Sequence, residues 1–549
     1  MKKNNIVILV ILLIVYYVIL YKFLPSDKTV FFNDTNMPCI VVEDNIIFED
    51  NPVIMESNNI LISFDVIKKY IDPNICFDEN ENMVVITLKD RVGRYKINSQ
   101  TATINNKVIY LNNQLKNYND VVYVPLDIVK ANYDLNAEYN KDTGIVVIDF
   151  KNVEHIMGEV IDKNGDIRTK PSIKAPILLK DIHIGSKIKI YEEFDKWYKV
   201  RTESGIVGYI NKSYVKISYQ NKTNVIAVDE KKKEEKINLT WDYVYSKESY
   251  KDENFDATGL NVISPTWFSI MSKEGLISDK GNFAYVQNYH SKGYKVWGLV
   301  NNSFDPDITH EILNNSTARG KIINELLDIY EKYKLDGINL DFENIYLKDK
   351  DVYVQFVREL VPLFREKGMK VSIDVTNISV SENWSMSFDR KCLGEAADYI
   401  ILMSYDQHWS TSPVAGSVAQ YTWVEDGLED VLNEIPSEKL ILGVPFYTRL
   451  WKTENIDGVS STTSSTLTME NAEKFIEEKG IELVWDEPSG QYVAEYIDGN
   501  NTYKIWVEDS RSIQMKTSLV NKYELAGVAS WRKGFEKNEI WEVINSNLN

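Results

Sequence analysis

Apolar and polar positions alternate in a different way on either side of residue 237. Beyond this point, eight short aliphatic runs are separated by segments with apolar positions three or four apart, as in 321–332 and 353–364. Such alternation is typical of a parallel sheet covered by helices, and eight strands close a (β/α)8 TIM barrel. The expected strands are 239–244, 260–264, 295–300, 337–342, 370–375, 399–403, 440–444 and 526–530.

The connection between the seventh and eighth expected strands is too long for a simple loop. Residues 453–510 contain strand-like pieces of their own at 492–496 and 503–507. We therefore expect a small α+β insertion in the barrel, whose domain spans 237–549.

Residues 29–150 contain an internal repeat. Sliding the sequence by 62 positions lays 62–68 on 124–130 and 83–86 on 145–148. Each copy predicts a strand, a short helix, a turn and a second strand, so the pair forms one α+β unit. It resembles the copper amine oxidase N-terminal-like domain, a stalk of exported bacterial proteins. The segment has no histidine, so we expect a spacer without copper, with ligand binding as the alternative.

Residues 155–218 resemble a bacterial Src-homology-3-type domain, a small β barrel. The resemblance rests on Ile-Arg-Thr-Lys-Pro at 167–171, Trp-Tyr-Lys-Val at 197–200 and Gly-Ile-Val-Gly-Tyr-Ile at 205–210. Between residues 155 and 216 there are 12 basic and 8 acidic side chains, a local charge of +4. A basic module suits an anionic cell-wall polymer, whereas the alternative is a solvated spacer. Residues 219–236 are expected to be a charged linker.

The N-terminus carries the longest apolar run. After Lys2 and Lys3, residues 6–24 are almost wholly apolar, and about 19 residues at 1.5 Å each span the roughly 30 Å core of a bilayer. No small-residue cleavage site follows, so an uncleaved transmembrane anchor is favoured over a signal peptide. The basic N-terminus would stay in the cytoplasm, which leaves everything after Pro25 outside the cell, on the cell-wall side.

Composition excludes several classes of function. The formal net charge of −19 argues against nucleic acid as a partner. The three cysteines form no C-x-x-C pair, and the five histidines show no H-E-x-x-H spacing. We therefore expect no metal and no organic cofactor.

The most informative motif is the run from Asp336 to Glu343. Side chains two residues apart share one face of a strand, so Asn339, Asp341 and Glu343 line up, while 338, 340 and 342 require burial on the other face. Acids placed in this way can share out protons in a catalytic site. The structural alternative is a strand end with solvated charges.

The run resembles the Asp-x-x-Asp-x-Asp-x-Glu signature of glycoside hydrolase family 18, the chitinase-like barrels. Further similarity lies at 403–406, at 439–447 and at Trp531, and the resemblance covers 237–549. Asn339 stands where chitinases usually have Asp, and the Ser-x-Gly-Gly signature of the third strand is replaced by 297–301. Around Asn339 and at 406–409, the sequence most resembles the branch of spore-cortex and cell-wall N-acetylglucosaminidases. Both departures from the chitinase pattern favour a peptidoglycan-type linkage over chitin.

The resemblance implies substrate-assisted hydrolysis with retention. Glu343 would be the proton donor, Asp341 would bind the substrate's acetamido N–H, and Tyr405 would orient its carbonyl oxygen. Because Asn339 can donate to Asp341 without sharing a proton, Asp341 is expected to be more firmly ionised here than in a chitinase. The expected substrate-binding residues are Asn339, Asp406, Trp531, Trp267 and Tyr447.

Two rival functions remain open. The first is a non-catalytic, lectin-like protein that binds chitin or peptidoglycan on the same barrel. The second is a structural wall-adhesion protein in which the stalk and the small barrel do the binding. Retention of Asp341, Glu343 and Tyr405 favours the enzyme, because a lectin has no need of a proton donor.

Overall fold

The computed structural model describes residues 8, 10–17, 24–32, 39–56, 59–218, 235–249, 255–456 and 459–548. The chain forms two compact units, one of residues 1–75, 95–102 and 108–231, the other of 76–94, 103–107 and 232–549. Residues 6, 7, 9 and 18–23 of the predicted anchor 6–24, and all of the predicted linker except 235 and 236, lie outside the described residues. No helix within the described ranges combines the length and the apolar character that crossing a bilayer requires.

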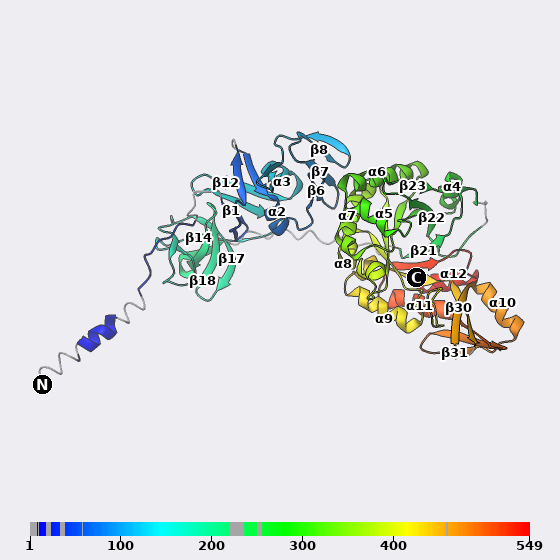
Figure 1. Ribbon diagram of the computed structural model, residues 1–549. Helices are drawn as coiled ribbons and strands as arrows, with labels where there is room; N and C mark the ends of the chain where they lie inside the picture. Colours follow the sequence, from blue (N-terminus) through cyan, green and yellow to red (C-terminus); the bar gives the residue numbers. More distant parts are fainter. Residues whose placement is uncertain are drawn as a thin grey trace. The chain divides into compact units, whose positions relative to one another are not determined.

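Eight parallel strands close the barrel of the second unit (Figure 1). Each strand pairs with the next, and β34 pairs with both β28 and β21, so the sheet has no free edge in the barrel. All eight expected strands are present, and each starts within two residues of its expected position. They are β21 (Ile237–Asp242), β22 (Val262–Ile270), β24 (Lys295–Asn301), β25 (Gly337–Asp341), β26 (Lys370–Thr376), β27 (Tyr399–Met403), β28 (Leu440–Pro445) and β34 (Gly527–Trp531).

Helices cover the outer face of these strands (Figure 1). The longest are α6 (Ser316–Tyr333) and α7 (Lys350–Glu366), and the Asn315 side chain caps α6 by accepting the N–H of Ala318. The apolar stripe of α7 is buried against the sheet, as its 3.6-residue period predicts. The remaining helices are α4 (Phe283–Ser291), α5 (Pro306–Leu313), α8 (Arg390–Ala396), α9 (Tyr421–Leu432), α11 (Ser510–Lys522) and α12 (Glu539–Leu548).

The strands separate two apolar clusters. Ile338 and Leu340 of β25 belong to the layer between strands and helices, whereas Trp241, Trp297 and Ile401 pack inside the barrel. Residues two apart therefore face the same side, and Asn339 and Asp341 point toward the barrel interior.

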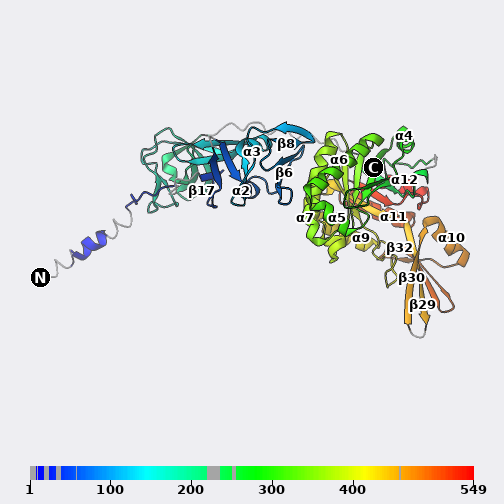
Figure 2. The same cartoon turned by 45° about the horizontal axis from the view of Figure 1, so that its top comes forward.

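An antiparallel sheet is inserted between β28 and β34. Its order is β30-β29-β33-β32-β31, and Figure 2 shows β29 and β30 as a long ribbon pair. The insertion begins at Tyr447, immediately after the barrel strand, rather than at 453. Its elements are β29 (Tyr447–Ile456), β30 (Val459–Thr468), α10 (Met469–Lys479), β31 (Val484–Asp486), β32 (Gln491–Asp498) and β33 (Asn501–Val507).

In the first unit, the repeat is visible in the pairing of its two copies. Strand β4 (Asn59–Ser63) leads into α2 (Phe64–Tyr70), and β11 (Val121–Pro125) leads into α3 (Leu126–Asn132). The strands pair antiparallel with residue 62 opposite 124, so equivalent positions of the repeat face each other. The other strands between 39 and 150, of which β5 and β6 fall in the second unit, are β1 (Cys39–Val42), β2 (Asn45–Ile47), β3 (Val53–Glu56), β5 (Cys76–Asp78), β6 (Met83–Thr87), β7 (Val92–Lys96), β8 (Thr101–Ile104), β9 (Lys107–Tyr110), β10 (Lys116–Tyr118), β12 (Leu135–Asn140) and β13 (Ile145–Phe150).

Residues 156–218 form the expected small β domain, a seven-stranded sheet in the order β16-β15-β19-β18-β17-β14-β20. Trp197 is buried in it and belongs to the core rather than to a ligand platform. The strands are β14 (Ile156–Val160), β15 (Ile167–Arg168), β16 (Ile177–Leu179), β17 (Lys187–Phe194), β18 (Trp197–Thr202), β19 (Val207–Asn211) and β20 (Val215–Ser218).

Candidate active site

Glu343 lies two residues beyond the end of β25, at the carboxyl end of the barrel. The side chain of Asn302, just after β24, holds its peptide from both sides. Asn302 Oδ1 accepts the N–H of Glu343 at 3.1 Å, and its Nδ2 donates to the Glu343 carbonyl at 2.7 Å. Asn302 also donates to Thr309 Oγ1 at 2.9 Å. Sequence reasoning missed Asn302, although a buried asparagine following a barrel strand was a signal for it.

The Glu343 carboxyl is set up to keep its proton. Burial raises its pKa well above the usual range, and the charges of Asp341 and Asp406 add to the effect. Both act in one direction, because desolvation and like charge each disfavour the carboxylate. A carboxylic acid at neutral pH can serve as a proton donor.

Asp341 is buried without the hydrogen bond expected from Asn339. Its residue is 8% exposed, burial raises its pKa to about 7, and its Oδ1 has no hydrogen-bond partner among the described residues. The expected donation from Asn339 to Asp341 is corrected, because the Asn339 amide donates to Asp374 and Ser372 instead.

Asn339 is completely buried, and its amide is fully used by the protein. Its Oδ1 accepts from Trp241 Nε1 at 2.8 Å and from Ser264 Oγ at 3.3 Å. Its Nδ2 donates to Asp374 Oδ1 at 2.6 Å and to Ser372 Oγ at 3.1 Å. We correct its assignment as a substrate contact, because no donor or acceptor of this side chain is left for a sugar.

Aromatic side chains gather at the same end of the barrel. The rings of Tyr405 and Trp241 meet edge to face at 6.4 Å, and those of Trp241 and Trp531 lie 5.8 Å apart. Tyr405 and Trp531 are partly exposed. Burial raises the pKa of Tyr405 well above 10, with Asp374 the next largest cause, so its hydroxyl stays a neutral donor. Sequence reasoning did not single out Trp241.

Asp406 follows Tyr405 and is held by two partners from the insertion. Tyr447 donates its hydroxyl to Asp406 Oδ1 at 2.6 Å, and Arg449 Nη2 donates to the same oxygen at 2.8 Å. The side chain of Asp406 is 43% exposed, whereas Tyr447 is buried. Tyr447 therefore positions Asp406 rather than offering its own surface to a sugar, and Arg449 is a residue that the sequence did not indicate.

Trp267 is placed away from this site. Its residue is 1% exposed, and its ring packs edge to face against Tyr285 at 5.0 Å and tilted against Tyr333 at 6.0 Å. These neighbours belong to the core between strands and helices. The assignment of Trp267 to substrate binding is corrected, because its ring has no free face on which a pyranose could stack.

A further acid, Asp374 of β26, joins the site. Its residue is 1% exposed, and it receives the amide of Asn339. An acid within the buried run of 371–375 was a signal that sequence reasoning passed over.

One group of acidic and histidine side chains in the first unit has ligand atoms close together. Glu43, Asp149 and His155 offer atoms within 4.8 Å of one another. Asp149 already accepts from Arg201 at 2.6 and 2.7 Å and pairs with Lys189 at 2.7 Å. Protein cations therefore occupy the position at which a metal ion would neutralise this carboxylate.

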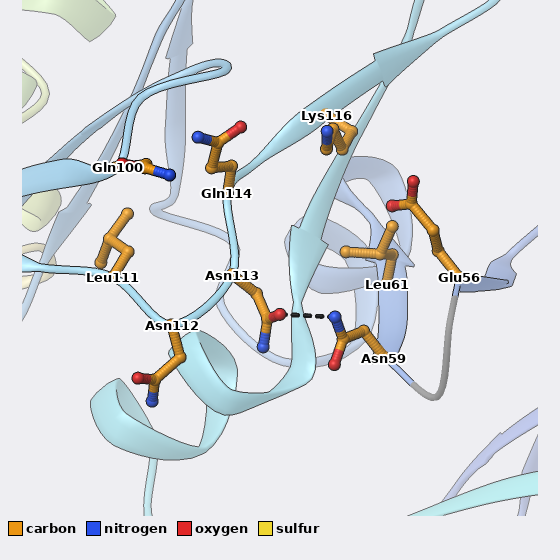
Figure 3. Close-up of a pocket in the computed structure, with 9 residues that line it drawn as sticks. All are labelled: Glu56, Asn59, Leu61, Gln100, Leu111, Asn112, Asn113, Gln114 and Lys116. Carbon is orange, nitrogen blue, oxygen red and sulfur yellow. Dashed lines mark hydrogen bonds between the residues drawn. The ribbon is translucent and has the colours of Figure 1, made fainter.

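The first unit also contains a polar recess of ≈ 350 Å³ in the repeat domain, shown in Figure 3. It is lined by residues of β3, β4 and β10, by residue 100 and by residues 111–114, and Asn59 donates to Asn113 within it. No residue assigned above to the active site lines this recess.

Comparison with known proteins agrees with this geometry. The family model "Glycosyl hydrolases family 18" matches residues 209–535, more than half of the chain. The models "Copper amine oxidase N-terminal domain" and "Bacterial SH3 domain" match 41–148 and 163–216. Both accessory resemblances seen in the sequence are thus confirmed.

Two curated relatives come from Bacillus subtilis. The chain is 26% identical over 299 residues to "Uncharacterized glycosylase YvbX", which covers 52% of this chain and 84% of that protein. It is 26% identical over 258 residues to "Cortical fragment-lytic enzyme", covering 46% of this chain and 59% of that protein. The chain thus spans less than two thirds of the second relative.

Two solved structures show the same fold. The spore cortex-lytic enzyme SleL of Bacillus cereus aligns with a TM-score of 0.52 at 21% identity, covering 57% of this chain and 74% of that one. A chitinase of Chromobacterium violaceum aligns with a TM-score of 0.50 at 22% identity, covering 57% and 99%. From its family match and its barrel, the chain belongs to glycosyl hydrolase family 18 and is a glycosidase.

Proposed function

We propose that this protein cleaves β-linked N-acetylglucosamine bonds in peptidoglycan or a chitin-like wall glycan by substrate-assisted, retaining hydrolysis. The observation that carries the proposal is the Glu343 carboxyl close to Asp341 at the mouth of the barrel, where burial and like charge raise its pKa. A carboxylic acid with a raised pKa, next to a second acid that titrates near neutrality, is suited to donating a proton and then recovering it.

In the first step, Glu343 gives its proton to the glycosidic oxygen of the departing sugar. The carbonyl oxygen of the substrate's 2-acetamido group attacks the anomeric carbon from the opposite face, and a cyclic oxazolinium ion forms. Asp341 accepts the acetamido N–H and stabilises the positive charge of the ring. The neutral hydroxyl of Tyr405 donates to the acetamido oxygen and orients it for attack.

In the second step, water opens the oxazolinium ion. The Glu343 carboxylate removes a proton from this water as the oxygen bonds to the anomeric carbon, which restores the acid and retains the configuration. Trp531 offers its partly exposed ring as the floor of the sugar subsite, and Asp406 lies near enough to raise the pKa of Glu343.

The preferred substrate is a peptidoglycan-type glycan rather than chitin. Asn339 replaces the acid usual in chitinases, and the third-strand signature of chitinases is absent. The similarity to a protein named cortical fragment-lytic enzyme supports the same substrate class.

The test is digestion of peptidoglycan and of chitooligosaccharides by the full-length chain, with new reducing ends identified by mass spectrometry. Glu343→Gln keeps the shape of the side chain but removes the acid. The activation barrier should therefore rise by about 3–5 kcal/mol, which slows turnover, while glycan binding persists. Glu395→Gln, at an exposed position of α8, is the matched control and should behave as wild type. Glycan capture without cleavage by the wild-type protein would instead support the lectin-like alternative.

The proposal extends to location. Residues 6–24 would anchor the protein in the cell membrane, the repeat domain would act as a spacer, and the basic domain 155–218 would bind the wall. The support is the length of the apolar run after Lys2 and Lys3 and the local charge of the small domain. Protease added to intact protoplasts should remove the glycosidase activity; protection of the activity would refute an outward-facing barrel.

A further inference from the structure

Two buried carboxyls lie at the same level of the barrel on neighbouring strands. Strands β25 and β26 pair in parallel, with Asn339 opposite Ser372 and Leu340 opposite Ile373. The next rung of this register brings Asp341 opposite Asp374, and both side chains share the inward face with Asn339. Adjacent strands are about 4.8 Å apart, so the two carboxyls are direct neighbours.

Each carboxyl of this pair has one oxygen without a hydrogen-bond partner among the described residues. Asp374 Oδ1 accepts from Asn339, but Asp374 Oδ2 has no partner among the described residues, and neither has Asp341 Oδ1. No lysine, arginine or histidine of the described residues forms an ion pair with either acid. Two buried anions without a cation would repel each other strongly, whereas one proton between them satisfies both orphaned oxygens.

We propose that Asp374 is a positioning residue that holds a proton shared with Asp341, its carboxylic O–H donating to the Asp341 carboxylate. The inference rests on the proposed function and deepens it, because it explains how Asp341 keeps a proton-sharing partner although residue 339 of the same strand is an asparagine. An acid on the neighbouring strand supplies the proton that Asn339 is unable to share. Since the amide of Asn339 donates to Oδ1, the proton belongs on Oδ2, the oxygen without another partner.

The electrostatics of the pair agree with this arrangement. Burial raises the pKa of Asp374 well above its usual value, and the charge of Asp341 adds to that rise. Burial also raises the pKa of Asp341, to about 7, so both carboxyls of the pair favour binding a proton. The other titratable groups facing the pair are Glu343, Tyr405 and Tyr353 of α7, and burial raises the pKa of each, which favours their neutral forms.

The shared proton stays with the pair during the reaction. Asp374 donates to one oxygen of Asp341, which fixes the plane of that carboxylate and leaves its other oxygen for the substrate's acetamido N–H. No proton passes from the pair to the product, because Glu343 supplies and recovers the one that is transferred. Asp374 thus acts through Asp341 and need not touch the sugar.

Two substitutions test whether Asp374 acts as a hydrogen-bond donor or only fills its place in the packing. Asp374→Asn keeps the size and an N–H donor toward Asp341, whereas Asp374→Leu keeps approximate size without a donor. We expect kcat to fall by about threefold to tenfold in the first and by a further factor of about ten in the second, with KM little changed. In Asp374→Leu the acid limb of the kcat/KM profile should move to higher pH, because Asp341 has lost the donor that stabilises its carboxylate, whereas in Asp374→Asn the limb should stay near the wild-type position, because the amide N–H replaces the carboxylic O–H.

Equal losses of kcat in the two variants, or an unshifted acid limb in Asp374→Leu, would overturn the proposal. A readout without substrate keeps it separate from the proposed function. In infrared difference spectra at pH 7, wild type minus Asp374→Asn should show the carbonyl band of a protonated carboxylic acid. Absence of this band refutes the shared proton even if the enzyme is active, whereas its presence in a protein that cleaves no glycan refutes only the proposed function.

Discussion

Replacing Asn302 with alanine should remove the side chain that holds the backbone of Glu343 in place. The substitution removes two hydrogen bonds to the Glu343 peptide, one to Thr309 and one accepted from the Phe304 N–H, all made by a side chain that is 1% exposed. At about 1 kcal/mol for each hydrogen bond, the barrel should lose roughly 3–4 kcal/mol of stability. The loss also frees the backbone that aims the Glu343 carboxyl.

The catalytic effect follows from geometry. A displacement of about 1 Å in a reacting group can cost on the order of a hundredfold in rate, so we expect kcat to fall by about tenfold to a hundredfold, or about 1.4–2.7 kcal/mol of barrier. KM should change little, because Asn302 makes its contacts with the protein. Steady-state kinetics on peptidoglycan fragments and urea unfolding of the barrel measure the two effects separately.

Thr309→Val is the matched control. It removes the hydrogen bond between Asn302 and Thr309 and the bond of Thr309 to the Asp305 carbonyl at 2.7 Å, but leaves both bonds of Asn302 to Glu343. This variant should lose about 1–2 kcal/mol of stability and keep nearly all its turnover. Equal losses of turnover in Thr309→Val and Asn302→Ala, or normal turnover in Asn302→Ala, would refute the role assigned to the Asn302 clamp.

Two other predictions concern charge and stacking. Because the folded-state pKa of Asp341 is raised to about 7, the folded protein binds more protons than the unfolded chain between about pH 4 and 7, and stability falls as pH rises through that window. Asp341→Asn should remove this loss, so urea titrations at pH 8 should show a barrel about 2–4 kcal/mol more stable, without turnover. A variant no more stable than wild type would contradict this prediction. Trp531→Ala should raise the Kd for glycan by about tenfold in calorimetry, whereas Trp267→Leu should lower the melting temperature and leave glycan affinity unchanged.

Much of the architecture could be predicted from the sequence because it depends on local periodicity. Eight aliphatic runs between helical patterns predict the barrel, and the strand starts agree within two residues. The internal repeat likewise predicts two matching strand–helix pieces, and the structure pairs position 62 with 124. Glu343 could be singled out because its neighbours two residues away share its face, and a period of two is a property of the strand itself.

The partners of that motif could not be predicted in the same way. Asp374, Asn302 and Trp241 reach the site from other strands, separated from Glu343 by helices whose lengths do not specify how one strand aligns with the next. Asn339 looked like a sugar contact and proved to be a buried bridge between Trp241 and Asp374. Trp267 looked like a platform and proved to be core.

By itself, then, the sequence determined which residues alternate into strands and helices, which face of each strand carries acids, and the family of the barrel. The tertiary structure alone decided which side chains meet inside it. The physical reason is that spacing along a strand follows from backbone geometry, whereas the register between strands is settled by closing eight of them around a packed interior. Burial in that interior then sets which carboxyl keeps its proton.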